Sequence, residues 1–121
     1  MTLKFRPFAS YENRALRVAL QDPQRVTQSQ ELEVVIDLDE FGDPSGIEIV
    51  GLCFALGSRA AGRLSDLVTG PGVRFSYDPE SDAAAIGVTV GSGTRVRKSI
   101  PKLATAGLDS DGQLVTLMVT L

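Results

Sequence analysis

Apolar residues occupy every second position in several segments of the chain. In the longest of these segments, Leu32, Val34, Ile36 and Leu38 alternate with acidic residues, and Val35 is the one exception. A period of two that is rich in β-branched residues predicts strands with one face toward a core and the other toward solvent. The positions expected to be buried are Leu16, Val18, Ile36, Leu38, Ile47, Ile49, Ile86, Val88, Leu108, Leu117 and Val119. The acids Glu31, Glu33, Asp37 and Asp39 are expected to face solvent and to protect an outer strand from aggregation.

The order of segments in the first half of the chain returns in the second half. The matching segments are Ser10-Tyr11 with Ser76-Tyr77, Ala15–Leu20 with Ala83–Val88, Arg25-Val26 with Arg95-Val96, and Leu38-Asp39 with Leu108-Asp109. The offset grows from 66 to 68 and then to 70 residues, as two small loop insertions in the second copy would produce. Each copy reads as two hairpins. The predicted fold class is therefore α+β, mainly antiparallel β, with two four-stranded repeats, a short helix between them and pseudo-two-fold symmetry.

Turn residues separate the strands and set the boundaries of the two copies. Asp109-Ser110-Asp111-Gly112 predicts a hairpin whose glycine has a positive φ, and residues 40–46 form its longer counterpart. Between the copies, Ser58 is a candidate N-cap, and residues 60–68 carry an apolar stripe at helical spacing. The chain, residues 1–121, thus divides into repeat 1 (about 3–55), a helical linker (about 56–72) and repeat 2 (about 73–121). We expect one compact domain, because a half of about 55 residues buries little core by itself.

The composition narrows the chemistry that this chain can perform. It is 43% hydrophobic and 22% charged, as is typical of globular proteins. Histidine is absent and Cys53 is the single cysteine, which excludes histidine catalysis, thiolate zinc sites and an intrachain disulfide. A net charge of -3 argues against nucleic acid as a partner. The apolar run Ile49–Leu56 is too short to cross a membrane, and a lone cysteine, expected to be a small buried hydrophobe, suits a cytoplasmic location.

Several segments together resemble a known bacterial family. They are Tyr77-Asp78-Pro79-Glu80-Ser81-Asp82-Ala83, Leu108-Asp109-Ser110-Asp111-Gly112, Val35-Ile36-Asp37-Leu38-Asp39 with Gly42, and Gly46-Ile47-Glu48-Ile49. Taken together they resemble the YuzE-like proteins, the family of domain of unknown function 2283, as a tandem duplication of two degenerate copies. The first copy lacks Asp-Pro after Tyr11, and the second has Gly107 where the family shows aspartate. The resemblance implies a small α+β domain without an established activity and an antitoxin-like or partner-binding role.

One spacing matches part of a calcium-binding loop. With Asp37 at position one, Asp39, Gly42 and Glu48 stand at positions three, six and twelve, where such a loop needs oxygen ligands and a sharp turn. Phe41 stands at position five and cannot ligate, and the segment reads as strand–turn–strand. We therefore assign no metal to Asp37, Asp39 and Glu48, and expect a hairpin with outward acids.

Three other groups of residues are candidates for chemistry. Asp78, Glu80 and Asp82 share a turn and suggest an acid–base pair or a magnesium site, but no partner base or nucleophile accompanies them. The one basic cluster consists of Arg95, Arg97, Lys98 and Lys102, without the interleaved aromatic residues of a nucleic-acid surface. Gly91-Ser92-Gly93 is too short for a phosphate-binding loop. We predict no catalytic, cofactor-binding or metal-ligating residue and no cofactor.

These observations favour a non-enzymatic interaction or structural module of the bacterial cytoplasm, with a protein partner or self-association. The alternative is a small hydrolase or metal-dependent enzyme that uses turn carboxylates. A concave pocket with converging carboxylates would favour the enzyme, and an acidic face beside an apolar patch would favour the binding module. Because the segment Val115–Leu121 carries no charge, we expect it to lie centrally in the sheet or in an interface, where its backbone groups are paired.

Overall fold

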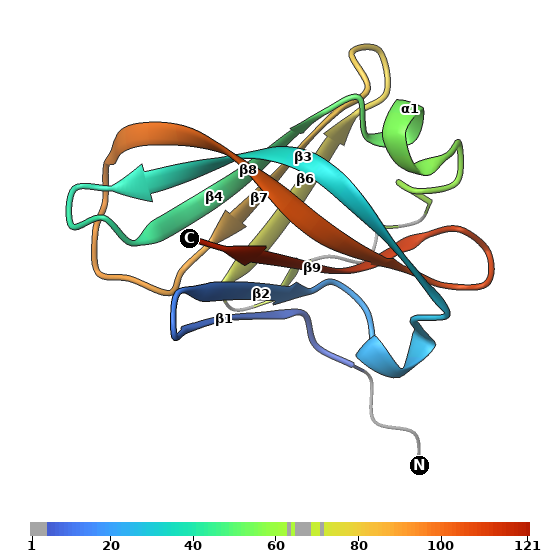
Figure 1. Ribbon diagram of the computed structural model, residues 1–121, viewed down its shortest axis with the longest axis horizontal. Helices are drawn as coiled ribbons and strands as arrows, with labels where there is room; N and C mark the ends of the chain where they lie inside the picture. The colour runs from blue at the N-terminus through green and yellow to red at the C-terminus, as the bar shows by residue number, and fades with distance from the viewer. Residues whose placement is uncertain (1–4, 63, 65–68, 71) are drawn as a thin grey trace.

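The structure, a computed structural model, describes residues 5–62, 64, 69–70 and 72–121. Its strands form one antiparallel sheet in the order β1-β2-β9-β8-β3-β4-β7-β6-β5 (Figure 1). The strands are β1 (Phe8–Glu12), β2 (Ala15–Ala19), β3 (Gln28–Asp39), β4 (Pro44–Val50), β5 (Thr69–Gly70), β6 (Val73–Asp78), β7 (Ala83–Val88), β8 (Val96–Leu108) and β9 (Leu114–Thr120). The sheet is accompanied by a 3₁₀ turn, η1 (Pro23–Arg25), and a short helix, α1 (Leu52–Leu56). The expectation of a mainly antiparallel sheet with a short helix is confirmed.

Segments from the two halves of the chain alternate across the sheet. The two longest strands, β3 and β8, pair at its centre, from Gln28 opposite Leu108 to Asp39 opposite Val96. Each continues into a hairpin, β3 into β4 and β8 into β9. Strand β4 then pairs with β7, and β9 pairs with β2. Each half of the chain therefore holds a hairpin of the other half between two of its own hairpins.

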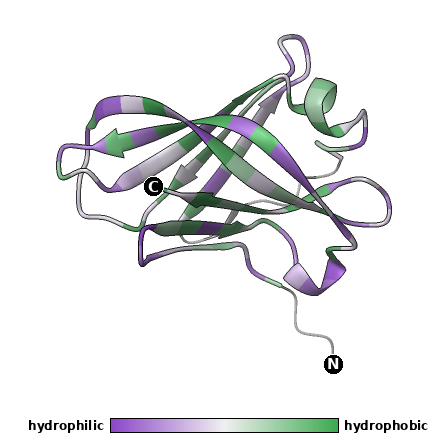
Figure 2. Ribbon diagram, viewed as in Figure 1, coloured by the Kyte–Doolittle hydropathy of each residue, from purple (hydrophilic) through white to green (hydrophobic). Residues whose placement is uncertain are grey.

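The sheet curls around a single interior, so that β6 and β7 lie behind β2 and β9 in the view of Figure 1. All the positions expected to be buried belong to this core except Leu38, which packs at its margin. Hydrophobic and hydrophilic residues alternate along β3 (Figure 2). Because burial of a large aliphatic side chain is worth about 1.5–3 kcal/mol, this alternation supplies much of the stability of the sheet.

Leu38 and Asp39 depart from the burial that the alternation predicts. Leu38 is half-buried, whereas Asp39 is only 2% exposed. The pairing of β3 shifts register here, between Asp37 and Leu38 toward β4 and between Leu38 and Asp39 toward β8. The extra residue lies in the partner strand each time, Ser45 in β4 and Arg97 in β8, and bulges of this kind bend and twist the pair locally, which re-aims the side chains beside them. The expectation that Asp39 faces solvent is therefore wrong.

A short helix, α1, lies before the segment that the sequence predicts to be helical. Helix α1 begins at Leu52, inside the segment assigned to repeat 1, and ends at Leu56, where the predicted linker begins, and Ser58, the predicted N-cap, lies in a turn. The start of α1 is fixed from a distance, because the carboxylate of Asp82 accepts hydrogen bonds from the backbone N–H groups of Cys53 (2.9 Å) and Phe54 (3.0 Å). The first N–H groups of a helix have no acceptor within it. Residues 63 and 65–68 of the predicted helix lie outside the described residues.

The acidic strand and the uncharged strand are both internal to the sheet. Strand β9 lies between β2 and β8, so the expectation that residues 115–121 run centrally is confirmed for β9. Strand β3 lies between β8 and β4, so the interpretation of the acidic segment as an outer strand is wrong. Glu31, Glu33 and Asp37 mark the solvent face of a central strand instead.

Candidate functional site

Asp39 is buried in the turn between β3 and β4. Its Oδ1 atom accepts hydrogen bonds from the backbone N–H groups of Phe41 (2.9 Å) and Asp43 (3.0 Å). Its Oδ2 atom accepts a third from Gly93, in the loop that leads into β8 (3.2 Å). Buried backbone N–H groups need acceptors, and the carboxylate supplies them here. Both oxygens of Asp39 are therefore directed at N–H donors, which is a structural role and not the arrangement of a calcium ligand.

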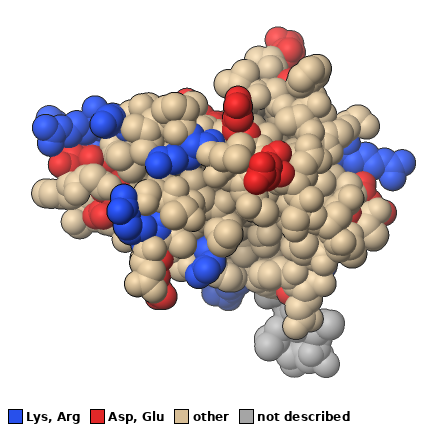
Figure 3. Space-filling view, viewed as in Figure 1, with Lys and Arg blue, Asp and Glu red and all other residues tan. Residues whose placement is uncertain are grey.

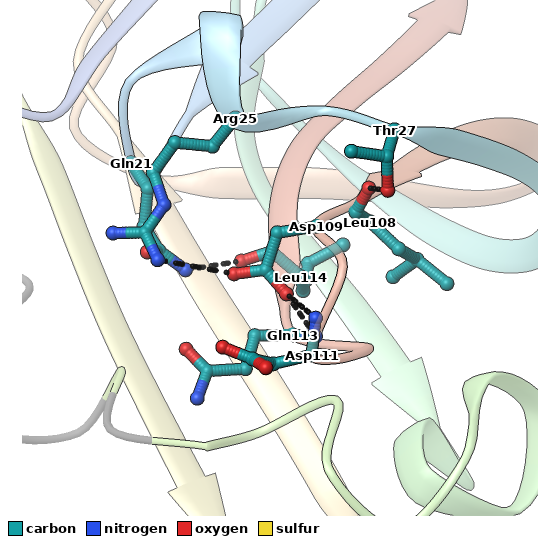
Figure 4. A network of polar contacts seen from close by, with 8 residues as sticks. All are labelled: Gln21, Arg25, Thr27, Leu108, Asp109, Asp111, Gln113 and Leu114. Atoms are coloured by element: carbon teal, nitrogen blue, oxygen red, sulfur yellow. Dashed lines mark hydrogen bonds and ion pairs between the residues drawn. The ribbon is translucent and has the colours of Figure 1, made fainter.

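Asp109 is buried in the corresponding turn between β8 and β9 (Figure 4). Its Oδ1 atom accepts hydrogen bonds from the backbone N–H groups of Asp111 and Gln113, both at 2.9 Å. Its Oδ2 atom lies 3.5 Å from Nη2 of Arg25, whose side chain is 54% exposed. The two backbone hydrogen bonds to Oδ1 are therefore the same as in the Asp39 turn. At Oδ2, the guanidinium of Arg25 replaces the backbone N–H that Gly93 provides to Asp39.

Two residues of the connection between β2 and β3 form hydrogen bonds with the second half of the chain. Gln21, 7% exposed, donates from Nε2 to the carbonyl oxygen of Leu114 at 3.0 Å (Figure 4). The backbone N–H of Thr27 donates to the carbonyl oxygen of Leu108 at 2.8 Å. The surroundings of Asp109 are thus a fully bonded structural junction.

The segment Gly91–Gly93 packs its backbone against the Asp39 turn. A Cβ atom at Gly91 would lie 2.7 Å from Cβ of Asp43, and one at Gly93 would collide with the Asp39 carboxylate. Glycine permits backbone to approach this closely because it has no Cβ. Glycine at these two positions therefore leaves room for the buried side chain of Asp39 and its neighbour Asp43, a role that could not be predicted from the sequence.

The carboxylates of the Asp78–Asp82 turn bind different donors. Asp78 accepts hydrogen bonds from the N–H of Glu80 and the hydroxyl of Ser81, both at 3.0 Å. Asp82 has a φ of 53° and directs its carboxylate at the start of α1. The structure therefore does not bring Asp78 and Asp82 together on one ligand, as the acid–base pair or magnesium site considered from the sequence would require.

Tyr77 links Asp82 to the single cysteine. Its hydroxyl donates to Oδ1 of Asp82 at 2.7 Å and lies 3.4 Å from Sγ of Cys53, which is half-buried and not fully buried as expected. The Tyr77 hydroxyl and the backbone N–H groups at the start of α1 stabilise the charged carboxylate and lower the pKa of Asp82 to about 2. The same hydrogen bond raises the pKa of Tyr77 above its ordinary value.

Asp37 and Glu48 lie side by side on the outer face of β3 and β4. Asp37 accepts a hydrogen bond from the hydroxyl of Ser99 at 2.7 Å. A hydrogen bond with Asp37 and the negative charge of that residue raise the pKa of Glu48 above its ordinary value. Two acids of the calcium-like spacing therefore meet, while Asp39 lies inside. Within the described residues, no group of three or more histidine, cysteine, aspartate or glutamate side chains could hold a metal ion.

An open hollow of about 560 Å³ lies across β3, β4 and β8, and we call it the outer groove. It is lined by Glu33, Val34, Val35, Glu48, Val50, Pro101, Lys102 and Leu103. Val50 is 83% exposed and Leu103 is 55% exposed, which is unusual for large apolar side chains at the centre of a sheet. In the space-filling view, two groups of acidic atoms stand in the middle of the visible face, with a group of basic atoms beside them (Figure 3). Apolar and acidic groups thus lie together on this face.

The outer groove could not be predicted from the sequence, because its lining comes from three strands whose mutual register is not readable from the pattern. One signal was present, since Val35 interrupts the acidic side of β3. The structure also divides the basic cluster. Lys102 lines the outer groove, whereas Arg97 and Lys98 line a separate hollow with Phe41 near the turn after β3.

Comparison of the chain with family models, curated proteins and solved structures finds no match. Among the described residues, no helix has the length and apolar character needed to cross a membrane. Function is therefore inferred from the geometry of the two turns and of the outer groove.

Proposed function

We propose that this protein is a non-enzymatic module of the bacterial cytoplasm that binds another protein, and that the outer groove is its contact surface. The observation that carries the proposal is the exposure of Val50 and Leu103 beside Glu33 and Glu48. An exposed apolar patch with a polar rim is typical of protein interaction sites. Partner binding is also the role that resemblance to the YuzE-like proteins implies.

The hydrogen bonds of the turn carboxylates favour this function over an enzyme. A hydrolase or metal-dependent enzyme that uses turn carboxylates needs their oxygens directed at a substrate, a water or a metal. Asp39, Asp78 and Asp82 direct their oxygens at backbone and side-chain donors of the protein itself. Glu33 and Glu48, by contrast, line the outer groove.

We further propose that the chain consists of two copies of a YuzE-like unit, β1–β4 and β6–β9, related by a pseudo-two-fold axis. The strand order supports this. The counterparts in the two copies are β1 and β6, β2 and β7, β3 and β8, and β4 and β9. If each strand is replaced by its counterpart, the order β1-β2-β9-β8-β3-β4-β7-β6 becomes the same order read from the other end, as a two-fold axis requires. The registers support it as well. Tyr11 pairs with Leu16 in the first copy and Tyr77 pairs with Ala84 in the second, at the offsets of 66 and 68 residues that the repeat predicts.

This arrangement gives the outer groove a distinct origin. The proposed axis passes between β3 and β8, where Glu33 lies opposite Leu103. These two residues are 70 positions apart, the same offset that relates the two buried aspartates, so they are one position of the repeat. Glu31 and Pro101 are related in the same way. At these two repeat positions the first copy contributes an acid and the second contributes an apolar side chain.

The proposed function is tested by affinity capture from the native host with matched variants. The double substitution Val50→Lys with Leu103→Lys should lower capture of the bound proteins at least about tenfold, because apolar residues at the centre of an interface carry most of the affinity. The control is Met118→Lys, at a position that is 40% exposed and not among the groove residues. Circular dichroism checks that each variant is folded.

The proposal is supported if the wild type and Met118→Lys capture the same proteins and the double variant does not. It is overturned if the folded double variant captures the same proteins at the same yield. It is also overturned if the wild type captures no protein above the level of an empty resin.

A further inference from the structure

The charges around the outer groove are predominantly acidic. Glu33 and Glu48 line it, and Asp37 lies beside Glu48. Glu31 lies on the same outward side of β3, and Lys102 is the one cation among the described lining residues. Like charges held close together destabilise each other, and an opposite charge placed between them is favourable. A ligand of this surface should therefore carry positive charge.

The floor of the outer groove is apolar. Val35, Val50, Pro101 and Leu103 present their side chains between the acids, on three adjacent strands. Removal of such surface from water is worth about 25 cal/mol per Å², so an apolar group of the ligand should cover it. Opposed residues on neighbouring strands lie about 5 Å apart, and this spacing suits side chains of one extended or helical segment.

The same features disfavour other classes of ligand. Phosphate groups of nucleic acids or of an anionic membrane would be repelled by Glu33 and Glu48. A small molecule binds best where most of its surface is buried, whereas Val50 at 83% exposure stands in an open hollow. A segment of polypeptide can supply both charge and apolar contact across such a surface.

We propose that the outer groove binds a protein segment in which lysine or arginine residues flank apolar residues. This inference rests on the proposed function and specifies the partner. The apolar residues cover Val50 and Leu103, and the basic residues pair with Glu33 and with the Asp37–Glu48 pair. Binding should weaken as ionic strength rises, because exposed ion pairs are screened over about 10 Å at 0.1 M salt.

Three synthetic peptides of about ten residues test this inference by fluorescence anisotropy. One alternates lysine with leucine, the second alternates glutamate with leucine, and the third alternates lysine with serine. The first should bind at least about tenfold more tightly than the other two, because it alone supplies both charge and apolar area. Equal affinity for the first and second peptides overturns the inference.

Matched variants link this binding to the outer groove. Glu33→Gln with Glu48→Gln should weaken binding of the lysine–leucine peptide about three- to tenfold and remove most of its salt dependence. Met118→Ser, outside the groove, should leave the affinity unchanged. An unchanged affinity in the Glu33→Gln, Glu48→Gln variant overturns the inference, as does tighter binding of anionic vesicles or of a single-stranded oligonucleotide than of the peptide.

The same variants separate this inference from the proposed function. If the captured proteins depend on Val50 and Leu103 but are retained in full by Glu33→Gln with Glu48→Gln, the binding module stands and the basic partner is refuted. If capture is insensitive to Val50→Lys with Leu103→Lys, the proposed function itself fails.

Discussion

The turns that hold Asp39 and Asp109 use the same hydrogen bonds with one difference. In both, Oδ1 accepts two backbone N–H groups of the turn, and a glycine follows at a positive φ of 83° or 81°. The difference lies at Oδ2, which accepts a backbone N–H from Gly93 in one turn and faces the exposed Arg25 guanidinium in the other. The shared part closes a hairpin, and the variable part joins that hairpin to another segment.

That other segment comes from the opposite half of the chain in each case. Gly93 lies in the connection between β7 and β8, and Arg25 lies in the connection between β2 and β3. These two connections occupy equivalent places in the proposed repeats. Each buried aspartate therefore fastens a hairpin of one half to a loop of the other half, once through backbone and once through an ion pair. The backbone version is rigid, whereas the exposed arginine can turn to solvent.

The largest effect is expected from removing the carboxylates. Asp39→Ala should lower the free energy of unfolding by about 4 kcal/mol, because three backbone N–H groups lose their acceptor. Asp109→Ala should lower it by about 3 kcal/mol, because only two backbone N–H groups lose theirs. Urea denaturation measures both. Asparagine variants keep the Oδ1 acceptor and should lower the free energy of unfolding less than the alanine variants. Asp39→Asn should be more destabilising than Asp109→Asn, because its amide NH₂ would face the backbone N–H of Gly93. An equal or larger loss for Asp109→Asn would contradict the difference between the turns.

A Cβ at the backbone contact should have the next largest effect. Gly93→Ala places an atom against the Asp39 carboxylate, which three hydrogen bonds hold in place, and should destabilise the protein by about 2 kcal/mol. Ser92→Ala, at an exposed position of the same loop, is the matched control and should change stability by less than about 0.5 kcal/mol. If thermal melting shows no difference between the two variants, the loop does not need this close contact.

A third carboxylate, Asp82, extends the comparison to a pH dependence. Its folded pKa of about 2 lies below the ordinary 3.8, so its charged form stabilises the fold above about pH 4, and this contribution is lost as the pH falls toward 2. Tyr77→Phe removes the main cause of the shift. The variant should have a lower urea midpoint at pH 7, and the difference from the wild type should shrink between pH 4 and pH 2. A difference that is constant with pH would refute this account of Asp82.

The smallest effect is expected from the ion pair. Arg25→Gln should cost about 0.5 kcal/mol, because the guanidinium is largely exposed, and added salt should reduce the difference from the wild type. The control is Arg95→Gln, the matching position of the second half, which forms no ion pair with Asp39 in the described part of the chain. Its stability change should not depend on salt. A salt-independent loss in Arg25→Gln would mean that the arginine acts through packing.

The sequence predicts burial well wherever burial depends on alternation within one strand. Ile36, Ile47 and Leu117 are buried as expected, because the pleat alone sends them inward. The pattern fails at Leu38, where a bulge changes the pairing of β3 with two neighbours at once. It also misses α1, because the carboxylate that caps this helix belongs to Asp82, which is 28 and 29 residues from the two N–H groups that donate to it. Neither feature has a local signal.

The sequence identifies the acidic residues of the candidate site, but it does not show which of them lie together or which way their carboxylates face. Asp37 and Glu48 do come together, but the orientation of Asp39 depends on Gly93, which is 54 residues away. The apolar side of the outer groove depends on the register that sets Val35 opposite Pro101. Contacts between strands that are distant in sequence therefore decide which acids are structural and which remain on the surface.

The two halves of the chain interlock in one sheet. Residue-resolved unfolding tests this interlocking most directly. Backbone amide signals followed through a urea titration by NMR report β4 and β9 separately. Because each of these strands pairs with a strand of the other half, amides of Ile47 and Ile49 should lose their native signals at the same urea concentration as those of Leu117 and Val119. Midpoints that differ between the halves by more than about 0.5 M would show that each half unfolds alone, and would contradict the interlocked sheet.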